Sequence, residues 1–142
     1  MIETLAGRIA MAVNDAPRAL AIYRDALVRF PNNRALTYAT IDALLRIGNA
    51  DEALKVIEAR QRASDDYQMY FARAKAYAEL KRVALSHQAL AEGYLRLGNP
   101  RAAVEQLMIA QKAGDASFQE LSIMEARLRE LRRLEEQTKK ER

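Results

Sequence analysis

The 142-residue sequence contains no cysteine and only one histidine, His87. Disulfides, thiolate-bound metals and an HExxH zinc site each need residues that this chain lacks. The serines also lack a histidine base, because the only neighbouring pair is Ser86-His87, and adjacent helical residues point about 100° apart. No glycine-rich phosphate-binding motif is present. We therefore expect no catalytic residue, no metal ligand and no cofactor in this chain.

Proline, glycine and long apolar runs are also scarce. The three prolines and five glycines lie mostly where helices are expected to end. No run of about 20 apolar residues occurs, so we expect no membrane-spanning segment. The opening residues, MIETLAGRIAMAV, have neither the basic start nor the continuous apolar segment of a signal peptide. Because the chain starts almost inside a helix, we expect it to be part of a longer protein.

The charge is balanced rather than concentrated. The net charge is +4, from 23 basic and 19 acidic residues. A nucleic-acid-binding surface usually combines clustered basic residues with aromatic ones. Here basic and acidic residues alternate along the expected helices, which is typical of a solvated helix face. We therefore expect no nucleic-acid partner.

A recurring pattern of small and large apolar residues organises what remains. Ala19, Tyr23 and Ala26 share one helix face, and Pro31 then ends that helix. The pattern recurs 34 residues later from Ala53, and again from Ala103. Small residues at such spacing allow two helices to approach closely. A 34-residue period resembles that of the tetratricopeptide repeat (TPR), a helical hairpin that stacks on copies of itself.

The chain is therefore predicted to be all-α, a TPR-like α-α superhelix of about eight antiparallel helices in a single domain, residues 1–142. Ala53 and Ala103 are 50 residues apart, 16 more than one period. We assign the excess to a helix over 82–97 that packs against both the helix before it and the helix after it. The final helix is predicted to cap the stack. The predicted helices cover residues 2–13, 15–30, 34–47, 50–62, 66–80, 82–97, 100–113 and 116–136.

The first helix of each TPR hairpin lines a concave groove. An aromatic residue flanked there by Arg, Lys and Asp is typical of a peptide-binding surface. Aromatic residues at helical spacing also occur in cores. We predict that Tyr77 and Tyr94 belong to the core, and for Tyr38 and Phe71 both the core and the groove stay open. The candidate groove residues are Arg8, Tyr38, Asp42, Arg46, Phe71 and Lys75.

A more specific resemblance covers residues 87–133, HQALAEGYLRLGNPRAAVEQLMIAQKAGDASFQELSIMEARLRELRR. This run resembles the C-terminal TPR domain of BepA-type zinc metalloproteases, above all in His87-Gln88-Ala89, Leu97-Gly98 and the stretch 125–131. Gly93 departs from that pattern, since an aromatic residue is common there. The rest of the chain resembles the family only as a TPR array.

The resemblance implies a periplasmic protein in which an HExxH protease domain precedes the TPR domain. It implies a role in outer-membrane protein quality control, with the TPR part engaging the assembly machinery or its substrates. Zinc would belong to the protease domain, which is absent from this chain, so no catalytic residue is carried over. The alternative is a free-standing TPR adaptor or assembly protein with no enzyme attached.

The first helix raises a separate question about partners. Ile2, Leu5 and Ile9 form an apolar stripe, which would contact a preceding element in a longer protein. In the isolated chain such a stripe tends to find another partner, giving a weak homodimer. Alternatively, the next two helices bury the stripe as ordinary core.

Overall fold

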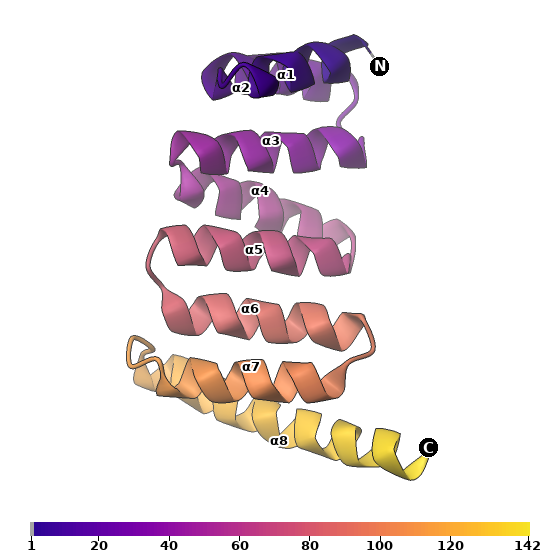
Figure 1. The fold of residues 1–142 in the computed structure, drawn as a ribbon, viewed down its shortest axis with the longest axis vertical. Helices are drawn as coiled ribbons and strands as arrows, with labels where there is room; N and C mark the ends of the chain where they lie inside the picture. Colours follow the sequence, from indigo (N-terminus) through magenta and orange to yellow (C-terminus); the bar gives the residue numbers. More distant parts are fainter. Residues whose placement is uncertain (1) are drawn as a thin grey trace. The chain divides into compact units, whose positions relative to one another are not determined.

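The computed structural model describes residues 2–142, which form eight α-helices and no strand (Figure 1). This confirms the predicted all-α class and the number of helices. The helices divide into two compact units, one up to Ala59 and one from Arg60, so that the boundary lies inside α4 (Ala50–Ala63).

The first unit contains α1 (Ile2–Ala12), α2 (Ala16–Arg29), α3 (Arg34–Ile47) and the start of α4. Short polar residues set the helix boundaries. The side chains of Asp15 and Asn33 accept hydrogen bonds from backbone N–H groups at the starts of α2 and α3, which satisfies donors that a helix start leaves unpaired. Gly48 ends α3 with φ 88°, a left-handed conformation that favours glycine.

The core of the first unit contains the small–large–small pattern found in the sequence. Ala19 and Ala26 are 0% exposed and Tyr23 is 2% exposed, and α2 packs on both α1 and α3. Gly7 of α1 lies directly against the Tyr23 ring. A β-carbon at Gly7 would be no further than 2.8 Å from three atoms of that ring. Glycine is therefore required here by the close approach of the two helices.

The apolar stripe on α1 is exposed. Ile2, Leu5 and Ile9 are 84%, 56% and 57% exposed, and Val13 just after the helix is 69% exposed. The expectation that this stripe is partly uncovered is confirmed, and the alternative of ordinary core is wrong. The contact that would cover it stays a prediction.

The second unit contains α5 (Tyr67–Glu79), α6 (Val83–Arg96), α7 (Pro100–Lys112) and α8 (Phe118–Lys140). The sequential order of packing is visible in Figure 1: α6 contacts both α5 and α7, and α7 contacts α8. The predicted role of the helix over 82–97 as a shared neighbour is confirmed. Gly98 and Gly114, with φ 78° and 85°, make the turns on either side of α7.

One apolar cluster joins three helices of this unit. Its members come from α6, α7 and α8, where Ala103, Leu107, Met124 and Leu131 are all 0% exposed. Small residues on α6 and α7 allow the helices to approach closely enough for the larger side chains of α7 and α8 to interlock. Other buried members are Ala84, Ala91, Val104, Ala110 and Leu128.

The last helix differs from its prediction at both ends. It begins at Phe118, where Ser117 and Glu120 form a capping box, and continues to Lys140 rather than ending near residue 136. An ion pair between Glu135 and Lys139, one turn apart with 3.4 Å between Oε1 and Nζ, supports this extension of the helix. Phe118 is 87% exposed.

Candidate functional site

Three of the candidate groove residues are charged residues of the first unit. Arg8 of α1 and Asp42 and Arg46 of α3 are exposed, and Asp42 pairs with Arg46 at 3.6 Å. All three act electrostatically on Tyr23. Burial raises the pKa of Tyr23, Asp42 raises it further, and Arg8 and Arg46 lower it. These charged residues of α1 and α3 thus share an electrostatic influence on the buried Tyr23 of α2.

Tyr38, the aromatic candidate of the same unit, is half-buried rather than fully exposed. The guanidinium carbon of Arg34 lies 5.2 Å from the centre of its ring, within the range of a cation–π contact. Tyr38 therefore presents one part of its ring to Arg34 and is not a free aromatic anchor.

The second unit contains the remaining two candidates. Lys75 is exposed, whereas Phe71 is half-buried. The Phe71 ring packs edge-on against the rings of Tyr94 of α6 and Tyr67. The distances between the ring centres are 5.4 Å and 6.3 Å, respectively. The Phe71 ring also covers Gly93, because a β-carbon there would lie 2.9 Å from the ring. Gly93 thus makes room for the Phe71 ring.

Tyr77 and Tyr94, both predicted to be core residues, are half-buried. Tyr94 packs against the apolar cluster of the second unit. Tyr77 instead faces Arg73, whose guanidinium carbon is 5.6 Å from the ring centre. The placement of Tyr94 in the core is confirmed by this packing, whereas the placement of Tyr77 in the core stays a prediction.

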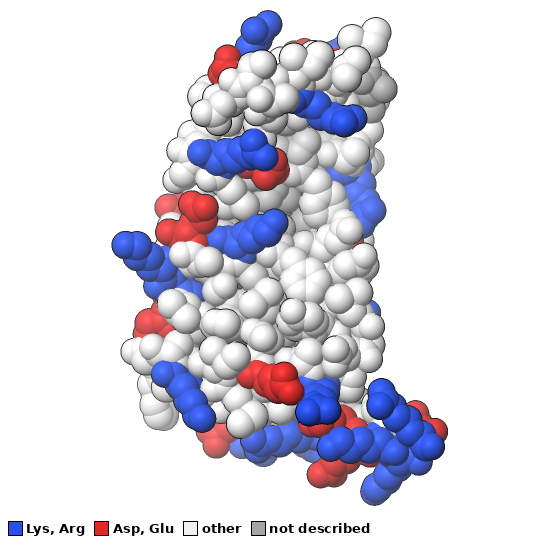
Figure 2. Space-filling model, in the orientation of Figure 1, with Lys and Arg blue, Asp and Glu red and all other residues white. Residues whose placement is uncertain are grey.

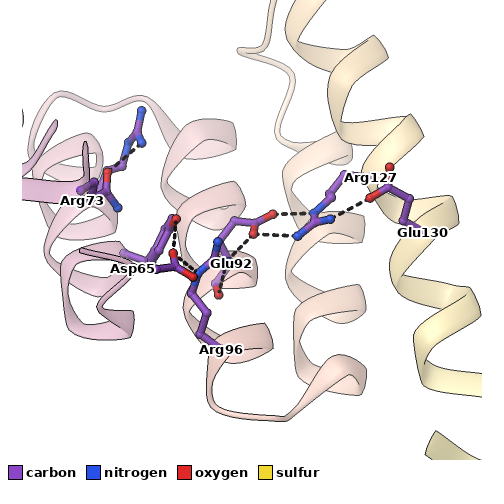
Figure 3. Close-up of polar contacts among 8 residues, drawn as sticks. Asp65, Arg73, Glu92, Arg96, Arg127 and Glu130 are labelled. Atoms are coloured by element: carbon purple, nitrogen blue, oxygen red, sulfur yellow. Dashed lines mark hydrogen bonds and ion pairs between the residues drawn. The ribbon is translucent and has the colours of Figure 1, made fainter. Parts of the chain in front are cut away.

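A network of ion pairs on α6 was not predicted from the sequence. Glu92 binds Arg96 one turn along α6, at 2.6 Å, and Arg127 of α8, at 2.8 Å (Figure 3). Arg96 also forms an ion pair with Asp65, in the loop before α5, with 2.7 Å between Nε and Oδ1. Arg127 also forms one with Glu130, with 2.7 Å between Nη1 and Oε2. Charges at helical spacing predict only the pairs within one helix; the pairs between helices depend on how the helices pack.

Glu92 is the centre of this network. Burial alone would raise its pKa, but hydrogen bonds from Arg127 and Arg96 outweigh burial and hold the pKa of Glu92 below its usual range. A carboxylate with a lowered pKa in the folded state stabilises that state above its unfolded pKa. This stabilisation is lost as the pH falls through the folded pKa.

Glu92→Gln should therefore lower the free energy of unfolding by about 1–2 kcal/mol at pH 7, because it removes a charge held by two guanidinium groups. The difference from wild type should shrink on acidification below about pH 4. Urea unfolding of both proteins at pH 7, 5 and 3 measures this difference in the free energy of unfolding. Glu105→Gln is the matched control, since the Glu105 side chain is 60% exposed in its pair with Arg101. A difference for Glu92→Gln that stays constant with pH would contradict this role.

Charge is otherwise spread over the surface. On the face in Figure 2, basic and acidic side chains are interspersed, and they gather most densely toward the C-terminal end of α8. Within residues 2–142, no group of three or more His, Cys, Asp or Glu side chains could hold a metal ion. None of the helices in this part of the chain is both long and apolar enough to cross a membrane.

The fold and these surfaces define a class of protein, namely a repeat protein of successive helical hairpins. A family model described as tetratricopeptide repeat matches residues 4–65 and 38–93. These residues make up more than half of the chain, which therefore belongs to the tetratricopeptide repeat family. No curated protein matches the chain. The family match ends at residue 93, so the run over 87–133 lies almost wholly beyond it.

Proposed function

We propose that this chain is the TPR domain of a BepA-type periplasmic zinc metalloprotease, where it binds the outer-membrane protein assembly machinery or its substrates. Membership of the TPR family indicates a protein–protein interaction module. The observation that carries the finer proposal is the resemblance over residues 87–133. Those residues form most of α6, all of α7 and most of α8, and these helices pack in succession. Zinc and catalysis would belong to the preceding protease domain.

Three charged residues, Arg8, Asp42 and Arg46, are our proposed contact surface for that partner in the first unit. Arg8, Asp42 and Arg46 are exposed, they come from two helices, and all three act electrostatically on the buried Tyr23. Side chains positioned by a packed core lose less conformational entropy on binding than side chains on a mobile loop. In the second unit, Lys75 would contribute. The exposed stripe on α1 would face the protease domain, or a second copy of the isolated chain.

A free-standing TPR adaptor is the second candidate. It is supported by the family match, since membership of the TPR family indicates an interaction module and is compatible with a chain that has no enzyme attached. The reading frame upstream of Met1 separates the two candidates. An encoded HExxH domain behind a signal peptide is the expected result, and an in-frame stop codon shortly upstream would overturn the protease proposal.

Partner binding can be tested with a photo-crosslinking amino acid placed at Arg46 or Lys75 in living cells. We expect crosslinks to a protein of the outer-membrane assembly machinery or to its unfolded substrates. Glu125 on α8 is a matched control, because its side chain is 66% exposed and lies outside the proposed surface. Equal crosslinking from all three positions, or none from Arg46 and Lys75, would contradict the proposed surface.

A further inference from the structure

A pocket of about 180 Å³ lies between α5 and α6 of the second unit. Tyr70, Arg73 and Tyr77 line it from α5, and Gln88 and Glu92 line it from α6. The walls are completed by Leu85 and Ala89. The pocket is therefore small, mostly polar on its α5 side, and large enough for one side chain.

Arg73 is the cation of this pocket, and its partners are neutral. It donates to Gln61 Oε1 at 3.1 Å and to the Tyr77 hydroxyl oxygen at 3.4 Å. No carboxylate pairs with it among residues 2–142. In Figure 3, Arg73 stands apart from the chain of ion pairs that runs through Arg96 and Glu92. Arg73 as a residue is half-buried, and a guanidinium without a counter-ion in a pocket favours an anionic ligand, since a partly desolvated charge is stabilised mainly by pairing.

The polar groups beside Arg73 are mostly donors. Tyr77 accepts from Arg73, which leaves its own O–H free to donate. The Gln61 amide nitrogen is buried and has no acceptor within the described chain. The Gln88 amide also lines the pocket. Hydrogen-bond donors thus exceed acceptors at this site, and a ligand that brings only acceptor oxygens would correct the imbalance.

Glu92 lines the pocket, but its charge is compensated and does not exclude a second carboxylate by repulsion. Its oxygens are held by Arg96 and Arg127 at 2.6–3.0 Å, so its negative charge is offset by two positive charges. The Arg96 guanidinium in turn lies 4.1 Å from the centre of the Tyr70 ring. With the network satisfied within itself, Arg73 is left as the uncompensated charge of the pocket.

We propose that this pocket binds the carboxylate of an Asp or Glu side chain presented by a protein partner, with Arg73 as the bidentate donor and the Tyr77 hydroxyl as a further donor. The apolar wall of Leu85 and Ala89 would contact the methylene groups of that side chain. The proposal rests on the proposed function, because it takes the chain to be a protein-binding module, and it names an acidic residue as part of the recognised sequence.

Nuclear magnetic resonance can test this site with glutamate capped as its N-acetyl, N-methylamide derivative, titrated at constant ionic strength. We expect saturable shifts of the Arg73 Nε–H and Gln88 side-chain resonances, with a Kd of about 10 mM for this single-residue probe. Capped glutamine should produce no saturable shift. An identical response to capped glutamine would overturn the proposal.

Variants assign the effect to the pocket. Arg73→Gln should abolish binding, and Tyr77→Phe, which keeps the ring, should weaken it several-fold. Arg101→Gln removes an exposed guanidinium on α7, whose side chain is 78% exposed, and should leave binding unchanged. Circular dichroism verifies that each variant is folded. Undiminished binding by a folded Arg73→Gln or Tyr77→Phe variant would contradict the assignment.

A titration with acetate distinguishes the two sources of a carboxylate. We expect acetate to bind several-fold more weakly than capped glutamate, because it lacks the methylene groups and the peptide units. Equal affinity would show a site for free small carboxylates and overturn the proposal of a protein side chain. The titrations use the isolated chain, so their outcome does not depend on crosslinking at Arg46 and Lys75. Failure of one proposal is thereby separable from failure of the other.

Discussion

Replacing Gly7 by Ala is expected to lower the free energy of unfolding of the first unit by about 1–3 kcal/mol. In an exposed helix the same change would stabilise by about 1 kcal/mol, because alanine has the higher helix propensity. Here the added β-carbon would overlap the ring of Tyr23, which is 2% exposed. A buried ring cannot move aside without displacing its own neighbours. The close contact between α1 and α2 would therefore open.

Hydrogen exchange followed by mass spectrometry would localise this effect, and urea unfolding would give its size. Faster exchange is expected in α1 and α2. Gly93→Ala is the matched comparison: its β-carbon would lie 2.9 Å from Phe71, whose half-buried ring has more room to shift. Combining Gly7→Ala with Tyr23→Leu should cost less than the sum of the two single changes. Additive costs would show that the contact between Gly7 and Tyr23 is not the cause.

The helices and their order could be predicted from the sequence because their signals are local. Ala19, Tyr23 and Ala26 define a buried face by spacing alone, and all three are buried as expected. Gly48 and Gly98 mark helix ends because left-handed backbone favours glycine. The shared role of α6 followed from simple arithmetic on the repeat length, and contacts of α6 with both α5 and α7 confirm it.

Contacts between distant segments could not be predicted in this way. Asp115, in the turn before α8, accepts hydrogen bonds from the backbone N–H groups of Val83 and Ala84 at 2.6 and 2.9 Å. It thus caps α6 from 31 residues away, while Arg82, at the N-cap position, makes no side-chain cap. Capping rules are applied to the residue just before a helix, so a cap supplied by tertiary packing leaves no local signal.

In the candidate site too, features with local signals could be predicted and contacts between distant segments could not. The helical spacing predicted that Arg8, Asp42 and Arg46 lie on exposed helix faces, and the structure adds that all three act electrostatically on the buried Tyr23. Spacing did not reveal the pocket at Arg73 or the network centred on Glu92. Both depend on which helix faces meet within the second unit, and therefore on the packing of α6 against two neighbours.

Leu107→Ala is expected to lower the free energy of unfolding by about 3 kcal/mol, the usual cost of truncating a fully buried leucine. Leu107 is 0% exposed in the cluster that joins α6, α7 and α8. The loss has two parts, the lost burial of apolar side-chain surface and the cavity left in the cluster. Hydrogen exchange should accelerate in α7 and α8.

The control for Leu107→Ala lies on the same helix. Ile109 is two residues further along α7 and 45% exposed, so Ile109→Ala should cost less than about 1 kcal/mol. Leu107→Met, which nearly conserves volume, should cost less than about 1.5 kcal/mol. Urea unfolding of the three variants under identical conditions measures the ranking. Equal losses of unfolding free energy for Leu107→Ala and Ile109→Ala would mean that α7 presents a different face to α8. The buried cluster would then contain other residues of α7.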